Sequence, residues 1–230
     1  DGGITWDQLG NISGISGNIR SMSYAPSNPQ VIYVANDNDL YKTINGGITW
    51  SLFTSSVSMI TYIAVHPSDP SKIWYTQSGY SQNSKVNYYD GSSWTNFTGT
   101  LPNVPVNCIV YENGSNDDLY IGTDLGVYYR NATMTDWIPF ATNLPNVIVN
   151  ELEISYSNNK IWAGTFGRGL WGSPLYNQSP TWDCINGACI DPGTGNGAYI
   201  SLSACQSNCI PTSPTCSYSI LNPIIETVFG

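Results

Sequence analysis

Hydrophobic and polar residues alternate in four short stretches of this chain, and the stretches recur at similar intervals. Each stretch has a period of two and is rich in β-branched and aromatic residues, as in Ile60-Thr-Tyr-Ile-Ala-Val65. Successive side chains of a strand point to opposite faces of a sheet, so this pattern predicts β-strands. The four stretches span residues 19–24, 60–65, 106–111 and 149–156.

Two more predicted strands follow each alternating stretch. Two of the intervening turns match, Ala25-Pro-Ser-Asn-Pro29 and His66-Pro-Ser-Asp-Pro70, where proline presets φ and Asn or Asp caps the turn. The second strands are predicted at residues 31–34, 72–75, 118–121 and 160–163. The third strands are predicted at residues 40–42, 86–89, 126–129 and 169–171.

A tryptophan marks the start of each predicted fourth strand. Trp6, Trp50, Trp94 and Trp137 are separated by 44, 44 and 43 residues. A repeat of about 40–50 residues with four short antiparallel strands is typical of a propeller blade. The sequence therefore predicts an all-β fold, with about four β-propeller blades that belong to a larger propeller.

The two ends of the repeat region are uneven. The last unit has no fourth strand, because the composition changes after residue 174, whereas residues 4–9 read as a fourth strand without a unit of its own. In closed propellers a strand from one terminus often completes the blade at the other. Residues 4–9 are one candidate to close the last blade into a four-bladed ring. The expectation that we prefer is that this chain is a piece of a longer protein with upstream blades, because it begins inside a repeat.

Composition excludes several functions. The net charge is −9 with only seven basic residues, whereas nucleic acids and anionic membrane surfaces are bound by clustered Lys and Arg. No apolar run approaches the roughly 18–20 residues that cross a bilayer. We therefore expect no nucleic-acid partner and no membrane insertion.

Five of the six cysteines lie in the last fifth of the chain, without histidine partners. This predicts disulfides and an oxidising, extracytoplasmic location rather than a zinc site. We expect Cys184, Cys189, Cys205 and Cys209 to form two disulfides, and of the three possible pairings we favour 184–205 with 189–209. Cys216 is left over, and Cys108 is expected to be a buried free thiol. The predicted domains are propeller blades at 1–176, a Cys-rich module at 177–210, and a linker or further module at 211–230.

The segment Thr43-Ile-Asn45-Gly-Gly47-Ile-Thr49-Trp50 resembles the Asp-box motif of sialidases, xyloglucan-cleaving hydrolases and sortilin-type receptors. The resemblance implies a structural turn on the blade periphery, with Trp packed between neighbouring sheets. Asp90 to Trp94 is a shorter version, and residues 131–137 are a degenerate one. The positions that match across the copies are Asp1, Gly3, Thr5, Trp6, Thr43, Asn45, Gly47, Thr49, Trp50, Asp90, Trp94 and Trp137.

A second resemblance covers roughly residues 1–175. Segments such as Ala163-Gly-Thr-Phe-Gly-Arg-Gly-Leu-Trp171 are similar to the terminal blades of large secreted bacterial proteins, in which Asp-box propellers precede Cys-containing modules. The resemblance implies a secreted, cell-surface protein that contacts glycans or proteins, with self-assembly or a larger parent complex as further possibilities.

Catalytic chemistry finds little support. Sialidases need an arginine triad, and Arg20, Arg130 and Arg168 are the only arginines. Glycosidases need two carboxylates on one face, about 5–10 Å apart. The acids nearest to inner strand ends are Asp124, Glu151 and Glu153. Their functional interpretation is a ligand-binding polar rim around the propeller channel, and the alternative is solvated strand residues.

Three other features have both a functional and a structural interpretation. Asp37 to Asp39 and Asn116 to Asp118 are predicted to lie in equivalent hairpins whose oxygens suit Ca²⁺. Capping of the turns explains these residues too, so we expect no metal or other cofactor. His66 is the only histidine and is read as structural. Tyr80, Tyr88 and Tyr89 are predicted to form a platform for sugars or protein partners, with inter-blade packing as the alternative.

The favoured function is a non-catalytic extracellular propeller module for adhesion, display or assembly at the cell surface through glycan or protein contacts. The alternative is the C-terminal part of a secreted glycoside hydrolase, xyloglucanase- or sialidase-like, whose catalytic residues lie outside this segment.

Overall fold

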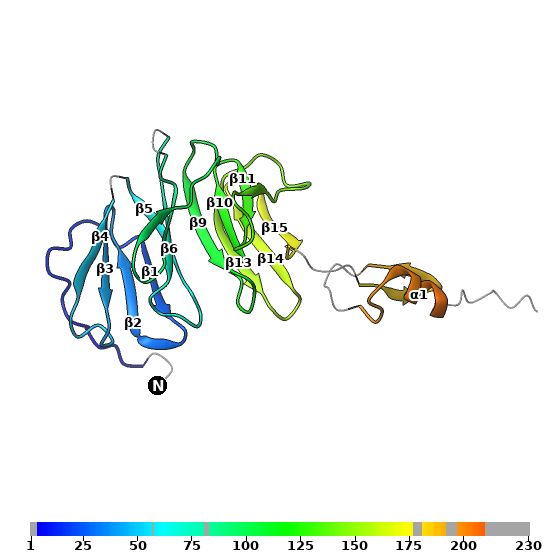
Figure 1. The fold of residues 1–230 in the computed structure, drawn as a ribbon, viewed down its shortest axis with the longest axis horizontal. Coiled ribbons are helices and arrows are strands. Elements are labelled where there is room, and N and C mark those ends of the chain that lie inside the picture. The colour runs from blue at the N-terminus through cyan, green and yellow to red at the C-terminus, as the bar shows by residue number, and fades with distance from the viewer. Residues whose placement is uncertain (1–3, 57, 81–82, 177–180, 192–196, 210–230) are drawn as a thin grey trace, which may run out of the picture. The chain divides into compact units, whose positions relative to one another are not determined.

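The computed structural model of the chain describes residues 4–56, 58–80, 83–176, 181–191 and 197–209. The chain divides into two compact units, with the boundary between Tyr176 and Asn177. The first unit holds four antiparallel sheets, and the second holds a hairpin and a short helix (Figure 1).

Each sheet of the first unit runs in chain order from its first strand to its last. The first sheet contains β1 (Ser21–Ala25), β2 (Asn28–Ala35), β3 (Asp39–Thr43) and β4 (Ser51–Ser55), and the second contains β5 (Ile60–Val65), β6 (Ile73–Gln77), β7 (Val86–Tyr89) and β8 (Trp94–Asn96). The third contains β9 (Val106–Tyr111), β10 (Leu119–Thr123), β11 (Gly126–Arg130) and β12 (Ile138–Pro139), and the fourth contains β13 (Val149–Ser155), β14 (Lys160–Thr165) and β15 (Gly169–Pro174). These are the predicted blades.

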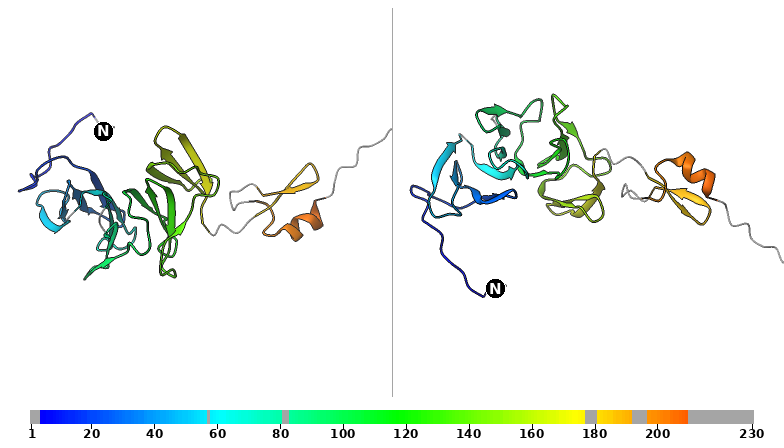
Figure 2. Two further views of the ribbon diagram at one scale, coloured as in Figure 1. Left: turned by 90° about the horizontal axis from the view of Figure 1, so that it is seen from above. Right: turned by 60° about the horizontal axis from the view of Figure 1, so that its bottom comes forward.

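The first strands lie at the centre of the arrangement. β1 contacts β5, β5 contacts β9, and β9 contacts β13, and Figure 2 shows the four sheets set around this inner row. Every residue of β6 and β10 is buried, because these second strands are covered by neighbouring sheets on both faces. Apolar residues from adjacent sheets form three cores, represented by Tyr33 with Ile63, Trp74 with Ile109, and Tyr120 with Leu152. The all-β propeller prediction is confirmed.

The periodic tryptophans do not all lie in equivalent environments. The ring of Trp94 lies 5.7 Å from that of Phe53 in the preceding sheet. Trp137 is only 5% exposed, and its Nε1 donates to the Phe97 carbonyl at 2.6 Å. Trp50 is half-buried, whereas Trp6 is 90% exposed. Packing between sheets is therefore found for Trp94 and Trp137 but not for Trp6.

The expected strand at residues 4–9 is wrong. This segment forms no strand and does not pair with β15. Instead the Gly10 amide donates to the Gly47 carbonyl at 2.8 Å, which places the segment beside the first sheet (Figure 1). This bond holds Gly10 at the first sheet, whereas β15 belongs to the fourth. Within the described residues, the fourth sheet has three strands.

The second unit is organised by its cysteines. β16 (Asp183–Ile185) and β17 (Ala188–Ile190) form a hairpin across Asn186 and Gly187, both with positive φ, as a tight two-residue turn requires. The helix α1 (Leu202–Asn208) begins at Ser201, whose Oγ accepts the Ala204 amide at 3.1 Å.

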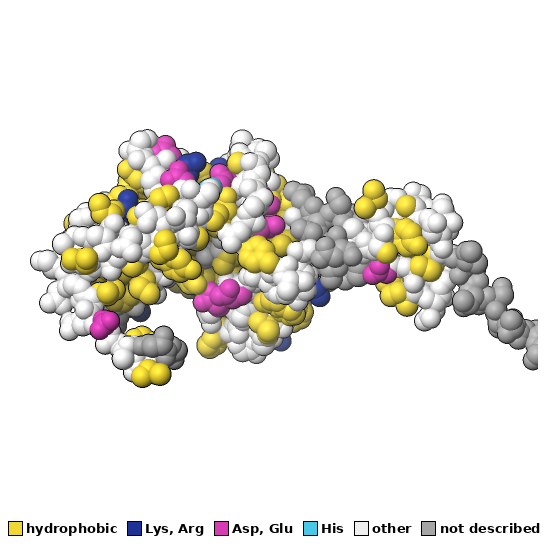
Figure 3. Space-filling model, turned by 90° about the horizontal axis from the view of Figure 1, so that it is seen from below, with side chains coloured by type: hydrophobic (Ala, Val, Ile, Leu, Met, Phe, Trp, Pro, Cys, Tyr) yellow, Lys and Arg dark blue, Asp and Glu magenta, His cyan; other side chains and the backbone are white. Residues whose placement is uncertain are grey.

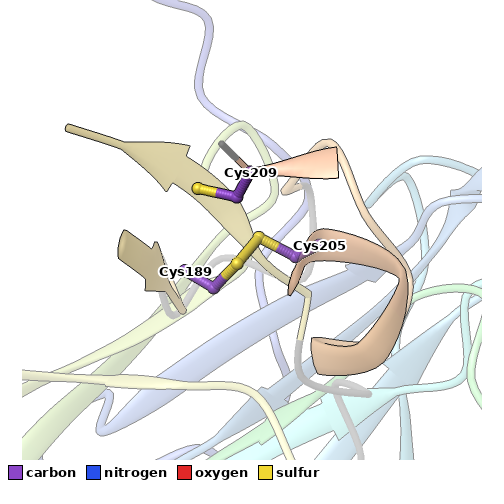
Figure 4. Close-up of side chains that lie close together, drawn as sticks. All are labelled: Cys189, Cys205 and Cys209. Atoms are coloured by element: carbon purple, nitrogen blue, oxygen red, sulfur yellow. A yellow bond between two sulfur atoms is a disulfide. The ribbon is translucent and has the colours of Figure 1, made fainter. Parts of the chain in front are cut away.

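The four cysteines form two disulfides, as predicted, but the favoured pairing is wrong. Cys184 bonds to Cys209. Cys189 bonds to Cys205, as Figure 4 shows. Cys184 and Cys189 face each other across the hairpin, and the two helix-end cysteines are four residues apart, on one side of a helix. The direction in which α1 crosses the hairpin decides between the pairings, and the sequence does not reveal it. Cys216 lies outside the described residues.

The described helix, α1, is too short and too polar to cross a membrane.

Candidate functional site

Tyr80 and Asp124 are brought together from neighbouring sheets. Tyr80 lies in the connection from β6 to β7, and Asp124 lies in the connection from β10 to β11. Both connections join a second strand to a third, so they emerge at the same end of their sheets. The Tyr80 hydroxyl donates to Asp124 Oδ2 at 2.5 Å, and this hydrogen bond raises the pKa of Tyr80. Tyr80 is 66% exposed.

Asn107 extends this cluster to the fourth sheet. Its Nδ2 donates to Asp124 Oδ1 at 3.0 Å and to the Val149 carbonyl at 3.1 Å. The Asp124 carboxylate therefore accepts a hydrogen bond on each oxygen, and three sheets are joined by one polar network. We call Tyr80, Asn107 and Asp124 the Tyr80 cluster. Its carboxylate is fixed in direction while the tyrosine ring stays open to solvent.

Glu151 forms a second bridge across the inner strands. The Tyr62 hydroxyl, from β5, donates to Glu151 Oε1 of β13 at 3.0 Å, so the pair spans the intervening strand β9. Burial and the charge of Glu151 raise the pKa of Tyr62. Glu151 is thus held by a partner in another sheet, and its carboxylate is oriented rather than free.

Glu153 lies in a hollow at the centre of the arrangement. The hollow has a volume of about 210 Å³ and is lined by residues of all four first strands, among them Ser23, Val65, Val110 and Glu153. Tyr156 borders it and accepts the Asn113 amide at 2.9 Å. The predicted acids therefore occupy three places: Asp124 in the Tyr80 cluster, Glu151 across β9, and Glu153 in the hollow.

Tyr88 and Tyr89 are not beside Tyr80. The Tyr88 ring stacks on Trp74 with 4.8 Å between centroids, and Tyr89 lies 5.1 Å from Trp94. Both contacts lie within the second sheet, and Tyr89 also lies 5.0 Å from Phe53 of the first sheet, which corresponds to the alternative of aromatic packing between blades. The two tyrosines lie near the end of β7, whereas Tyr80 precedes its start, so no platform of three rings forms.

Lys85 supports the loop that carries Tyr80, a role that the sequence did not reveal. The residue is fully buried, and its Nζ donates to the Gly79 carbonyl at 2.5 Å. Burial lowers the pKa of this lysine. Since Gly79 directly precedes Tyr80, the buried ammonium group anchors the loop that presents the tyrosine ring. A lone lysine before a strand carries no sequence signal for this role, because lysines are usually exposed.

The two acidic segments considered for calcium are not equivalent. Residues 37–39 join β2 to β3, whereas residues 116–118 join β9 to β10, at the opposite end of a sheet. Asn36 Oδ1 accepts the Asp39 amide at 2.6 Å, and Asp117 Oδ1 accepts the Tyr111 hydroxyl at 2.8 Å. Among the described residues, the one group of closely spaced potential metal ligands is formed by Cys189, Cys205 and Cys209, which are disulfide-bonded.

The contacts of the arginines and of the histidine stabilise the fold and do not form a common site. Arg20 Nε lies 2.6 Å from Asp37 Oδ1, whereas the Arg130 guanidinium lies over the ring of Phe97. Arg168 belongs to an exposed turn, so the three arginines do not converge. His66 Nδ1 accepts the Asp69 amide at 3.1 Å, which caps the turn after β5 and leaves the Nε2 proton for Asp117 at 3.4 Å.

Cys108 is buried and free, as the sequence predicted. Burial raises the pKa of its thiol, and the charge of Glu151 adds to the shift. A raised pKa in the folded state means that stability is present below the ordinary thiol pKa and is lost as pH rises above it.

We therefore expect Cys108 not to react with a thiol reagent such as DTNB at pH 8 in the folded protein, and to react fully in 6 M guanidinium. The measurement is absorbance of the released thiolate in the Cys216→Ser variant, with the denatured protein as the reference for full reaction. Rapid modification of Cys108 in the native state would show that the β9 core opens easily.

Solved structures share this fold over about three quarters of the chain. An ancestral GH74 enzyme aligns with a TM-score of 0.61 and 18% identity, covering 76% of this chain and 26% of its own. YCF48, solved with a D1 peptide, aligns with a TM-score of 0.55 and 14% identity, covering 77% and 57%. The extracellular domain of BT4673, a putative one-component system of B. thetaiotaomicron, aligns with a TM-score of 0.56 and 18% identity, covering 73% and 22%.

These likenesses define the class of protein by fold: the first unit is built from β-propeller blades. The chain spans about a quarter of the GH74 enzyme and just over half of YCF48. No protein-family model matches the sequence, and no curated protein matches it.

Proposed function

We propose that this chain is a non-catalytic propeller module of an extracellular, cell-surface protein, and that it binds a glycan or a protein segment at the Tyr80 cluster. The observation that carries the proposal is the combination of an exposed aromatic ring with an oriented carboxylate and amide, drawn from neighbouring sheets. A ring face packs on a sugar ring or an apolar side chain, and the fixed polar groups set the orientation of the ligand.

The net charge of the chain limits which classes of ligand suit its surface. With a net charge of −9, the surface favours neutral or basic ligands over phosphates and other polyanions. Acidic and hydrophobic side chains lie among uncharged polar ones on the face shown in Figure 3. Hydroxyl-rich glycans and peptides that carry Lys or Arg both suit such a surface.

The carboxylates support binding rather than hydrolysis. Both oxygens of Asp124 accept hydrogen bonds from protein side chains, and Glu151 is held by Tyr62. A glycosidase needs one carboxyl group as acid and a second as base or nucleophile across the scissile bond. The alternative function is the end of a secreted glycoside hydrolase whose catalytic residues lie elsewhere. The observation that supports this alternative is the likeness to GH74 enzymes.

The turn from β3 to β4 supports the Asp-box assignment. Asn45 Oδ1 accepts the Thr49 amide at 3.0 Å, and Thr43 Oγ1 accepts the Gly47 amide at 3.0 Å. In the shorter copy, the Ser93 and Ser92 amides donate to Asp90, which lowers the pKa of that carboxyl. These side chains are occupied within their own turns, so their role is structural rather than ligand binding.

Two disulfides and the likeness to an extracellular domain support an extracellular location.

A glycan array and a peptide array, probed with the whole chain, test the proposed function. Bound polysaccharides are then incubated with the protein, and new reducing ends are measured. The proposal expects binding without new reducing ends. Turnover that a single Asp→Asn substitution abolishes would establish an enzyme and contradict the proposal.

Replacing Tyr80 with alanine should weaken binding to the strongest array ligand roughly 5–30-fold, as expected for a binding residue worth about 1–2 kcal/mol. The matched control is Tyr24→Ala, which removes a similarly exposed ring from the first sheet. Isothermal titration calorimetry gives both dissociation constants. Equal affinities for the two variants would show that the ligand does not bind at the Tyr80 cluster.

A further inference from the structure

The three interfaces between neighbouring sheets repeat one arrangement. In each interface, an aromatic residue from the second strand of one sheet packs with an aliphatic residue from the first strand of the next sheet. The pairs are Tyr33 with Ile63, Trp74 with Ile109, and Tyr120 with Leu152. We call the face that carries the aromatic residue the forward face of a sheet, and the opposite face, which carries the aliphatic residue, its rear face.

The forward face of the fourth sheet has no partner within the described residues. By the strand registers, Trp162 of β14 has the position of Trp74, and Leu170 of β15 has the position of Val86. Trp74 and Val86 are buried beneath the third sheet, whereas Trp162 is only half-buried and Leu170 is 68% exposed. The fourth sheet therefore presents side chains that are buried at the same positions of an earlier sheet.

The rear face of the first sheet is open in the corresponding way. By the registers of β1 with β2 and of β5 with β6, Met22 has the position of Ile63, and Tyr24 has the position of Val65. Ile63 and Val65 are buried against the first sheet, whereas Met22 is 69% exposed and Tyr24 is 59% exposed. Large apolar side chains that gather on an exposed face are typical of an interaction surface.

The N-terminal segment leaves these side chains uncovered. Residues 10–17 lie along the first sheet, where the Gly10 amide donates to the Gly47 carbonyl and the Ser16 carbonyl accepts Asn36 Nδ2 at 2.9 Å. The exposed fractions of the two β1 side chains are those with this segment in place. The segment can therefore stay at its own sheet when another sheet binds the rear face.

We infer that the forward face of the fourth sheet binds the rear face of the first sheet of a second copy of this chain. The interface continues the arrangement that already joins the four sheets of one molecule, and this chain carries both of its halves. Figure 1 shows the two sheets at the two ends of the row. Because two different faces meet, copies associate head to tail, which gives a ring or a longer chain of copies.

The inference goes beyond the proposed ligand-binding function. Tyr80, Asn107 and Asp124 belong to the second and third sheets, so they contribute to neither of the two faces. Loss of ligand binding would leave the head-to-tail interface intact, and loss of the interface would leave the Tyr80 cluster intact. The alternative occupants of the two faces are further sheets of a longer chain and an unrelated protein.

Sedimentation equilibrium of the whole chain tests the inference. The parent is compared with Met22→Asp, which changes the rear face of the first sheet, and with Leu170→Asp, which changes the forward face of the fourth. The matched control is Leu125→Asp, which places the same charge on an exposed turn of the third sheet. All three positions are exposed, so each variant should keep the far-UV spectrum and the urea midpoint of the parent.

We expect the parent and Leu125→Asp to self-associate, and Met22→Asp and Leu170→Asp each to associate at least tenfold more weakly. An equimolar mixture of these two weakened variants should form a 1:1 complex, because one keeps an intact forward face and the other an intact rear face. A mixture that stays monomeric, or association that either variant leaves unchanged, would overturn the inference. A monomeric parent would also overturn it and assign the two faces to other occupants.

Discussion

Replacing Trp137 with alanine is expected to lower the free energy of unfolding by about 3–5 kcal/mol, the range for truncating a buried aromatic residue. The side chain fills the space between the second and third sheets together with Val106 and Ile109, and its indole N–H bonds to the Phe97 carbonyl. Alanine would leave a cavity and an unpaired carbonyl. Urea denaturation followed by circular dichroism measures the loss.

Trp6→Ala is the matched control, because Trp6 occupies the same repeat position but is exposed. It should change the free energy of unfolding by less than about 0.5 kcal/mol, as most exposed positions do. The comparison is made at low protein concentration, so that self-association does not contribute. Losses of similar size at Trp6 and Trp137 would mean that the repeat position alone, rather than burial between sheets, determines stability.

Reduction of the disulfides should unfold the second unit and leave the sheets folded. The two bonds join cysteines 25 and 16 residues apart, and each closure of this length is worth about 3 kcal/mol. Few residues of the described part of this unit are buried, and two of these are Cys205 and Cys209. A unit with so small a core depends on its cross-links.

Hydrogen exchange with mass spectrometry checks this prediction. After mild reduction, the amides of α1 should exchange at rates typical of unfolded peptides, while those of β6 and β10 keep their protection. The Cys205→Ser variant should reproduce the loss without a reductant. Protection of α1 that survives reduction would show that contacts other than the disulfides hold this unit together.

The sheets could be predicted because two signals agree along the chain. Alternation marks each first strand, as in β5, and the tryptophan period sets the length of the unit. Residues 4–9 carry the same local pattern without forming a strand, because a strand also needs a neighbouring edge within reach. Local sequence predicts which segments can be strands, and tertiary contacts decide which of them pair.

The candidate site was only partly predictable. Tyr80 and Asp124 were each selected by residue type and by place in a loop, but their hydrogen bond joins residues 44 positions apart. The roles of Asn107 and Lys85 depend on which loops adjoin, and that is decided by how neighbouring sheets pack. Tyr88 and Tyr89 are aromatic residues in a strand, and such residues fit an exposed binding platform as well as a buried core. The sequence alone could not distinguish these two environments.

The most direct test of the proposed binding function is a crystal structure of the whole chain with the strongest ligand from the arrays. The proposal predicts a ligand on the ring of Tyr80, within hydrogen-bond distance of Asp124 or Asn107. A ligand bound at the turn from β3 to β4, or on the disulfide-linked unit, would contradict it.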